Sequence, residues 1–238
     1  MHTVLNGAKI CVFATMFTGE QHLAVLGRKD RGISSPKDLK GKRIGVSIGT
    51  NGEYFLDTVL LLNGVPRDQI EAVNVEPKRM IEVLMKGDVD AIATWNPQLY
   101  EARKELGTKG VTFYAEGFYS PVFIIAARQD YAEQKPDTMQ RVVRALIQAT
   151  DFIQSRPEES RGMVTEQLGA DKDILNGLNS TYRFKITLDQ SLLVTLESQA
   201  KWAIKNGLTD AQEIPNFLDF ICSDALERVN PEAVDIIR

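Results

Sequence analysis

The sequence predicts an α/β fold, because segments with strand periodicity alternate with segments of helical periodicity in the stretch from residue 41 to residue 97. Residues 43–48 have a strand pattern that ends at Gly49, and residues 50–63 carry apolar side chains at the spacing of one helix face. The pattern then repeats as an apolar run, a helix and a second apolar run, at residues 72–75, 77–86 and 91–95. Parallel strands need a long crossover, so this alternation predicts a small parallel sheet.

The composition is that of an ordinary globular protein. The chain has 238 residues, 43% hydrophobic and 25% charged, which suffices for one large domain or two lobes. Its net charge of −4, without a basic cluster, argues against nucleic acid as a partner. No apolar run approaches the roughly 18 residues of a membrane span, so membrane insertion is not expected.

Small polar residues follow one predicted strand, and a large aromatic beside an amide side chain follows another at the same edge of the predicted sheet. Gly49, Thr50 and Asn51 follow the first strand, and Trp95 and Asn96 follow a later one. In open parallel sheets, ligands collect beyond the carboxyl ends of the strands, where helix N-termini present free backbone N–H groups. These five residues are therefore candidate ligand-binding residues for a small polar molecule.

Structural roles are open for the same residues. Thr50 and Glu53 have the spacing of a capping box, and a cap can coexist with ligand binding. Trp95 could be a core aromatic, and Asn96 could cap the following helix. A carboxylate at Glu53, in the first helical turn, would disfavour a dianion and favour a neutral, zwitterionic or amine-bearing solute.

Four segments carry a family resemblance, and they occur in the order GISSPKDLKGKRIGVSIGTNGEYFL, VPRDQIEAVNVEP, MKGDVDAIATWNP and YSPVFIIAARQDY. With them, the chain from about Ile10 onward resembles the solute-binding proteins of ABC importers in the aliphatic-sulfonate, taurine, nitrate and NMT1/THI5-like group. The resemblance implies a two-lobed, periplasmic-binding-protein-like fold of type II that closes on a small-molecule ligand. It also implies ABC permease subunits as partners and a periplasmic or cell-surface location. No cofactor or metal is expected, because the sequence offers no motif or spacing for one.

The resemblance sets the expected lobes. Lobe two is expected at residues 38–116, and lobe one at residues 1–37 and 117–238, with a helical C-terminal part. Tyr119, at the second crossing, could line the cleft or pack at the hinge. Residues 1–9 have no signal-peptide core, and family members place strands before Ile10, so lobe one is expected to be incomplete at its N-terminus. Exposed strand edges would then favour homo-oligomerisation or a loss of ligand binding.

Several local expectations follow from the pattern. Residues 10–15 and 21–28 are expected to form a hairpin or neighbouring strands of lobe one, and residues 29–42 the first crossing between lobes. Residues 121–127 are apolar enough for a central buried strand. Cys11 and Cys222 fit no metal spacing and are expected to be free thiols rather than a disulfide.

Catalysis is not expected. The chain contains only two histidines, so no Ser/His/Asp set is credible, and His22 is expected to be a packed strand residue. P-loop, GxGxxG and HExxH motifs are absent from the sequence. The pyrimidine synthase of the THI5 branch uses a cysteine-rich motif and its own histidine, neither of which this chain offers. The remaining alternative to a transport receptor is a ligand-sensing or accessory domain of the same fold.

Overall fold

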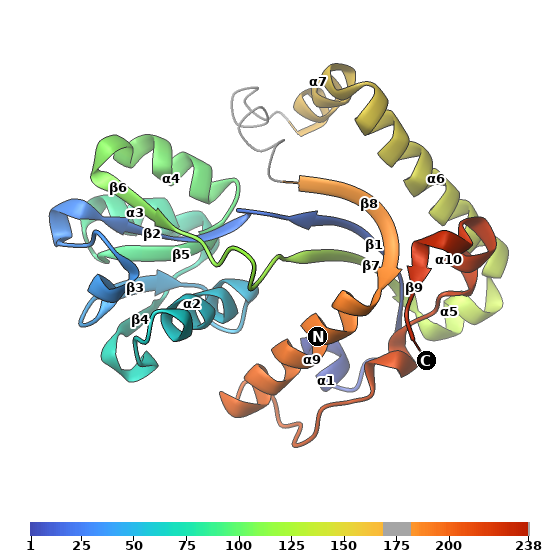
Figure 1. Cartoon of the computed structure of the whole chain (residues 1–238), viewed down its shortest axis with the longest axis horizontal. Coiled ribbons are helices and arrows are strands. Elements are labelled where there is room, and N and C mark those ends of the chain that lie inside the picture. The colour runs from blue at the N-terminus through green and yellow to red at the C-terminus, as the bar shows by residue number, and fades with distance from the viewer. Residues whose placement is uncertain (169–181, 238) are drawn as a thin grey trace. The chain divides into compact units, whose positions relative to one another are not determined.

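The chain folds into two compact units, each with its own sheet (Figure 1). The computed structural model describes residues 1–168 and 182–237. Residues 169–181, within the predicted helical C-terminal part, lie outside the described residues. The two units have the following ranges: unit 1 comprises Met1–Thr18, Val122–Met163 and Arg183–Arg238, and unit 2 comprises Gly19–Pro121 and Val164–Tyr182.

Unit 2 contains a five-stranded sheet in the order β4-β3-β5-β2-β6. Its strands are β2 (Leu23–Arg28), β3 (Arg43–Val46), β4 (Glu71–Asn74), β5 (Ala91–Trp95) and β6 (Gly110–Phe113). β3 pairs in parallel with both β4 and β5, as the crossover argument predicted. β2 is antiparallel to β5 and to β6, so the sheet is mixed.

Helices cover both faces of this sheet. Helix α2 (Asn51–Leu62) packs on one face, and α3 (Met80–Lys86) and α4 (Gln98–Leu106) pack on the other. Strand alternation explains the two cores: in β2, Val25 packs with α2, whereas Leu26 packs with α3 and α4. Both are fully buried. The sheet is therefore a rigid platform for the loops at its edges.

Unit 1 contains a four-stranded sheet in the order β7-β1-β8-β9. Its strands are β1 (Ile10–Gly19), β7 (Val122–Arg128), β8 (Tyr182–Asp189) and β9 (Val234–Asp235). The helices of unit 1 are α1 (His2–Leu5), α5 (Gln129–Gln134), α6 (Pro136–Ser155), α9 (Gln190–Lys205) and α10 (Asp224–Val229). Helix α7 (Pro157–Leu168) begins in unit 1, and its residues from Val164 onward belong to unit 2. The helical C-terminal part that the sequence predicted is confirmed within the described residues. No helix in this described part is both long and apolar enough to cross a membrane.

Short 3-10 turns connect many of these elements. They are η1 (Lys29–Arg31), η2 (Pro36–Leu39), η3 (Arg67–Gln69), η4 (Pro77–Arg79), η5 (Gly107–Lys109), η7 (Phe217–Phe220) and η8 (Pro231–Ala233). In η2, Ser35 and Asp38 form a capping box with Pro36 at the first helical position, as its sequence suggests.

The predicted pairing of residues 10–15 with 21–28 is wrong. β1 pairs with β7, whereas β2 lies between β5 and β6 in the other sheet. The reason is burial: Leu23 to Leu26 are 0–2% exposed, and a strand buried on both faces needs a central position. The first division of the chain therefore falls after Thr18 rather than after residue 37, and the second after Pro121 rather than after residue 116.

Residues 29–42 are consequently not a crossing between lobes. Ile33 and Leu39, from this segment, are fully buried in the α2-side core of unit 2. The segment returns the chain from β2 to the start of β3. Because the segment is rich in charged residues and contains two glycines, the sequence did not indicate that Ile33 and Leu39 are buried.

Two expectations for unit 1 are also corrected. The strand predicted to be central, β7, lies at an edge of the sheet among the described strands, and most of its residues are only half-buried. Cys11 and Cys222 form a disulfide, with Cα atoms 5.6 Å apart. The backbone N–H of Cys222 donates to Val12 O at 2.9 Å, so the C-terminal segment runs beside β1. A contact across 211 residues leaves no local trace in the sequence.

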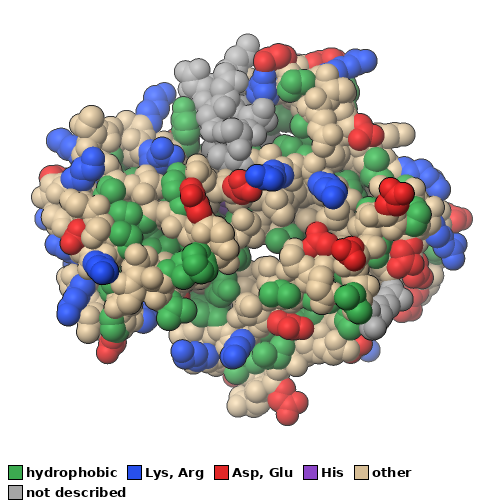
Figure 2. All heavy atoms as spheres, in the orientation of Figure 1, with side chains coloured by type: hydrophobic (Ala, Val, Ile, Leu, Met, Phe, Trp, Pro, Cys, Tyr) green, Lys and Arg blue, Asp and Glu red, His purple; other side chains and the backbone are tan. Residues whose placement is uncertain are grey.

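Charges of both signs are spread over the molecule on the face shown in Figure 2. Several form exposed ion pairs, including Arg43 with Glu71 at 3.2 Å and Lys86 with Glu82 at 2.6 Å. Exposed pairs of this kind contribute little to stability, because water and salt screen them. The buried cores within each unit and the disulfide within unit 1, rather than these pairs, account for most of the stability of the fold.

Candidate functional site

The predicted site residues gather at one edge of the sheet in unit 2. β3 and β5 are parallel neighbours, with Val46 opposite Ala93, so their carboxyl ends meet at the same edge. Ser47 follows β3 and leads into α2, and Trp95 ends β5. The topological argument that placed the candidate residues together is therefore borne out in their positions.

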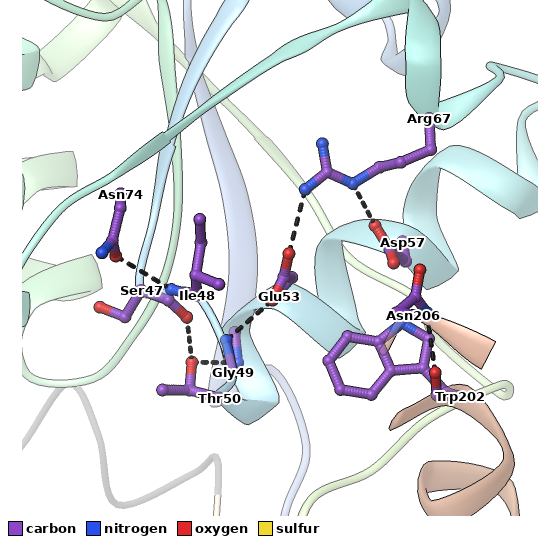
Figure 3. A network of polar contacts seen from close by, with 11 residues as sticks. Ser47, Ile48, Gly49, Thr50, Glu53, Asp57, Arg67, Asn74, Trp202 and Asn206 are labelled. Carbon is purple, nitrogen blue, oxygen red and sulfur yellow. Dashed lines mark hydrogen bonds and ion pairs between the residues drawn. The ribbon is translucent and has the colours of Figure 1, made fainter. Parts of the chain in front are cut away.

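The loop between β3 and α2 is held by a network of hydrogen bonds (Figure 3). Ser47 Oγ donates to Val75 O at 2.7 Å, and Thr50 Oγ1 donates to Ser47 O at 2.6 Å. The backbone N–H of Ile48 donates to the side-chain oxygen of Asn74 at 3.2 Å. Gly49 has a φ of 77°, a left-handed conformation that favours glycine. The loop is thus fixed in one conformation.

The start of α2 is capped but retains unused donors. Thr50 is the N-cap residue, and its Oγ1 accepts from Gly52 N–H at 3.2 Å. The carboxylate of Glu53 accepts from Gly49 N–H at 2.8 Å, one residue before the position expected in a capping box. The backbone N–H groups of Thr50 and Asn51 have no hydrogen-bond partner in the described part of the chain. Capping therefore leaves two donors at the positive end of the helix.

Trp95 lies against the first turn of α2. A Cβ atom placed on Gly52 would be 3.2 Å from Trp95 Cζ3 and 3.3 Å from Thr50 Oγ1, so the indole and the cap flank the same point. The indole is half-buried and packs against the α2-side core. Trp95 therefore contributes to the core and also reaches the edge of the sheet where the free N–H groups lie.

Asn96 offers a buried amide. Its backbone N–H donates to His22 O at 3.0 Å, and the residue is 7% exposed. Its side chain has no hydrogen-bond partner among the described residues, and the N-cap of α4 is Pro97, so the capping role considered for Asn96 is wrong. The amide is therefore available to a ligand.

Tyr119 packs on the same helix. Its ring meets that of Tyr54 edge-on, with centroids 5.1 Å apart, and lies 6.4 Å from that of Phe55. Both partners are in the first turns of α2, beside Asn51. Burial raises the pKa of Tyr54, so its phenol stays protonated at neutral pH. The structure thus brings all six predicted residues, Gly49, Thr50, Asn51, Trp95, Asn96 and Tyr119, to the surroundings of one helix N-terminus.

Sequence reasoning missed a charged cluster at this helix. Arg67 Nη2 lies 3.1 Å from Glu53 Oε1, and Arg67 Nε lies 2.7 Å from Asp57 Oδ1 (Figure 3). The signal was present in the sequence, because two carboxylates four residues apart on one helix face repel unless a cation joins them. The η3 turn, after α2, supplies that cation.

His22 is the other residue whose partner the sequence did not show. It is 6% exposed, as the packed role predicted, and its Nδ1 lies 2.9 Å from Tyr182 Oη. Burial lowers the pKa of His22 to about 4, so the imidazole is neutral at pH 7 and a weak base.

These groups are suited to binding rather than to chemistry. The edge offers backbone N–H donors, one amide side chain and aromatic rings, which together can hold a small polar molecule by hydrogen bonds and ring contacts. Within the described residues, no cluster of three or more His, Cys, Asp or Glu side chains could hold a metal ion.

Comparison with known families supports this interpretation of the fold. Residues 1–160 match the sequence model of the NMT1/THI5-like family. The chain belongs to this family. A Brucella abortus protein designated a binding protein is 28% identical over 189 residues, which cover 74% of this chain and 58% of that relative. The chain thus spans less than two thirds of the length of this family relative.

Two further comparisons extend the family picture. The taurine-binding periplasmic protein of Escherichia coli is 28% identical over 127 residues, covering 53% of this chain and 40% of that protein. The crystal structure of the periplasmic aliphatic sulphonate binding protein SsuA from Escherichia coli superposes with a TM-score of 0.77 at 18% identity, covering 92% of this chain and 75% of SsuA. The predicted periplasmic-binding-protein-like α/β fold is therefore confirmed.

Proposed function

We propose that this family member is a solute-binding protein of an ABC importer and that unit 2 contributes the N-terminus of α2 to its ligand site. The observation that carries the proposal is the pair of N–H donors at Thr50 and Asn51, which bond no described residue, beside the indole of Trp95 and the amide of Asn96, which likewise bonds none of them. Donors that lack partners in a fixed loop are preorganised for a ligand. Taurine and aliphatic sulfonates, named for the relatives, enter as candidate solutes, together with nitrate-like anions and pyrimidines.

Among these solutes, neutral or zwitterionic molecules have an advantage over simple anions. Glu53 places a carboxylate in the first turn of α2, and it already accepts the N–H of Gly49. The guanidinium of Arg67 is shared between Glu53 and Asp57, so Glu53 does not have it to itself. The field at the helix start is therefore less favourable to an anion than a bare N-terminus would be.

Export to the periplasm or the cell surface and docking to ABC permease subunits are parts of the same proposal. Disulfides persist in oxidising compartments, and Cys11 and Cys222 form one. The taurine-binding relative and SsuA are both periplasmic by name. Binding without catalysis is proposed because both cysteines are joined in that disulfide and His22 is a weak base.

A binding screen tests this function. Calorimetric titrations of the full chain with taurine, ethanesulfonate, nitrate and cytosine are expected to show that taurine or cytosine binds more tightly than the two anions. Trp95→Ala should weaken that binding at least about tenfold, because an aromatic contact is lost. Tyr100→Ala, on α4 at the opposite face of the sheet, is the matched control and should leave the affinity unchanged.

Failure has a distinct form for each part of the proposal. If none of the four probes binds at millimolar concentration, the solute-binding function is contradicted. If only ethanesulfonate and nitrate bind, the charge preference inferred from Glu53 is wrong. If Trp95→Ala binds as the wild type does, Trp95 does not belong to the site.

A further inference from the structure

We infer that Arg67 is a positioning residue that holds the β3–α2 loop in its binding conformation through Glu53. This inference rests on the proposed function, because its consequence for affinity concerns the same site. Arg67 touches none of the candidate ligand donors itself. It acts through one carboxylate, and that carboxylate accepts from the loop.

The two oxygens of Glu53 have separate tasks. Oε1 lies 3.1 Å from Arg67 Nη2, and Oε2 accepts from Gly49 N–H at 2.8 Å. The plane of the carboxylate is therefore set by a guanidinium on one side and by a backbone amide on the other, as Figure 3 shows. Because Gly49 directly precedes Thr50, the orientation of Gly49 N–H helps to fix the peptide groups that present the two free donors.

Arg67 is itself held in place. Its Nε lies 2.7 Å from Asp57 Oδ1, so the guanidinium spans two carboxylates that are one helical turn apart. A planar guanidinium, with Nη2 beside Glu53 and Nε beside Asp57, suits this task better than the single ammonium of lysine. The side chains are 11% exposed for Glu53, 18% for Asp57 and 35% for Arg67, so solvent screens the carboxylates poorly.

Removing the guanidinium would leave two poorly screened carboxylates facing each other across one turn. Truncating one partner of a buried ion pair is costly because the remaining charge lacks compensation. Glu53 is then expected to turn toward solvent and to release Gly49 N–H, so that the loop from Ser47 to Thr50 loses one of its anchors. The negative charge left at the helix start would also weaken the binding of anions more than the binding of neutral solutes.

Hydrogen exchange measured by NMR on the full chain tests the inference without a ligand. In Arg67→Met, the Gly49 amide should exchange about tenfold faster than in the wild type, because a hydrogen bond to a charged group is lost. Amides of β2 and β5 should be unchanged, which shows that the sheet remains folded. Arg67→Lys should give an intermediate rate.

A second substitution separates positioning from general damage. In Arg67→Met/Glu53→Gln the amide oxygen can still accept from Gly49 N–H without a net charge, so the slow exchange of Gly49 should return. Arg43→Met, which removes a guanidinium from an exposed pair with Glu71 at the other end of β3, should leave Gly49 unaffected. Taurine and ethanesulfonate titrations of the same variants should show a larger loss for ethanesulfonate in Arg67→Met.

The outcomes distinguish the two proposals. Unchanged Gly49 exchange in Arg67→Met, or a double variant that stays as fast as Arg67→Met, overturns the positioning role even if solutes bind. Faster exchange of the Gly49 amide in Arg67→Met, together with slow exchange in Arg67→Met/Glu53→Gln, supports the positioning role. If the wild type also binds no probe, that same result leaves positioning supported while the proposed solute-binding function fails.

Discussion

Replacing Cys11 and Cys222 by alanine is expected to lower the free energy of unfolding by about 4 kcal/mol. The disulfide closes a loop of 211 residues, and a cross-link over a loop of this length removes much of the conformational freedom of the unfolded chain. It also ties the C-terminal segment to β1, where Cys222 N–H donates to Val12 O. Without it, that segment is held by the parallel bridge of Ile221 to Val12 and by side-chain packing.

Urea unfolding with and without a reducing agent measures this effect. Reduction should lower the free energy of unfolding of the wild type by nearly as much as the Cys11→Ala/Cys222→Ala substitution does. The free energy of unfolding of the variant should not change on reduction. Mass spectrometry of the unreduced wild type should find the two cysteines joined. Free thiols in protein produced in an oxidising compartment, or equal stability of oxidised and reduced wild type, would contradict the stabilising role of the disulfide.

Acidification from pH 7 to pH 4.5 is expected to cost about 2–3 kcal/mol of stability through His22 alone. The folded protein keeps this imidazole neutral because burial lowers its pKa to about 4, whereas in the unfolded chain it takes up a proton below about pH 6.5. The unfolded state thus binds more protons in this window, so the contribution is fully present above pH 6.5 and is lost as the pH falls toward 4.

The comparison of two variants isolates this contribution from the titration of carboxylates. His22→Gln removes the titrating ring. On acidification from pH 7 to pH 4.5, its free energy of unfolding should therefore fall by about 2–3 kcal/mol less than that of the wild type. Tyr182→Phe removes the hydroxyl that lies 2.9 Å from His22 Nδ1 but leaves the imidazole buried, so it should keep the wild-type pH dependence. Equal acid sensitivity of His22→Gln and the wild type would show that His22 does not carry the effect.

The elements of unit 2 were predictable where the information is local. Residues 43–95 contain their own periodicities and turn residues, and the crossover argument then requires parallel pairing of β3 with β4 and β5. The same holds for the helical C-terminal part, which the sequence predicted and which includes α7 (Pro157–Leu168). Helix spacing and a proline at the first position are sufficient for such an element.

Strand partners were not predictable, because they depend on residues far apart in the sequence. β2 and β7 are both apolar runs, yet β2 is fully buried between two strands and β7 is a half-buried edge. An apolar run has the same appearance in either place. The disulfide was missed for the same reason, since nothing near Cys11 indicates that Cys222 lies beside β1.

The candidate site shows the same division. Gly49 to Asn51 and Trp95 could be placed together because strand ends meet at one edge of a parallel sheet. The partner of Glu53 could not be predicted from the sequence. Arg67 lies beside Glu53 only because the chain turns back toward α2 after that helix ends, at η3. Ligand-binding roles for these residues remain predictions until a solute is bound.

Chemical-shift mapping of the full chain with the probe that binds in the screen tests the central claim most directly. The backbone amides of Thr50 and Asn51 and the indole N–H of Trp95 are predicted to show the largest shifts in unit 2, with small shifts in α4 on the opposite face. Saturating binding that leaves these three N–H groups unperturbed would show that the solute binds elsewhere and would contradict the proposed site.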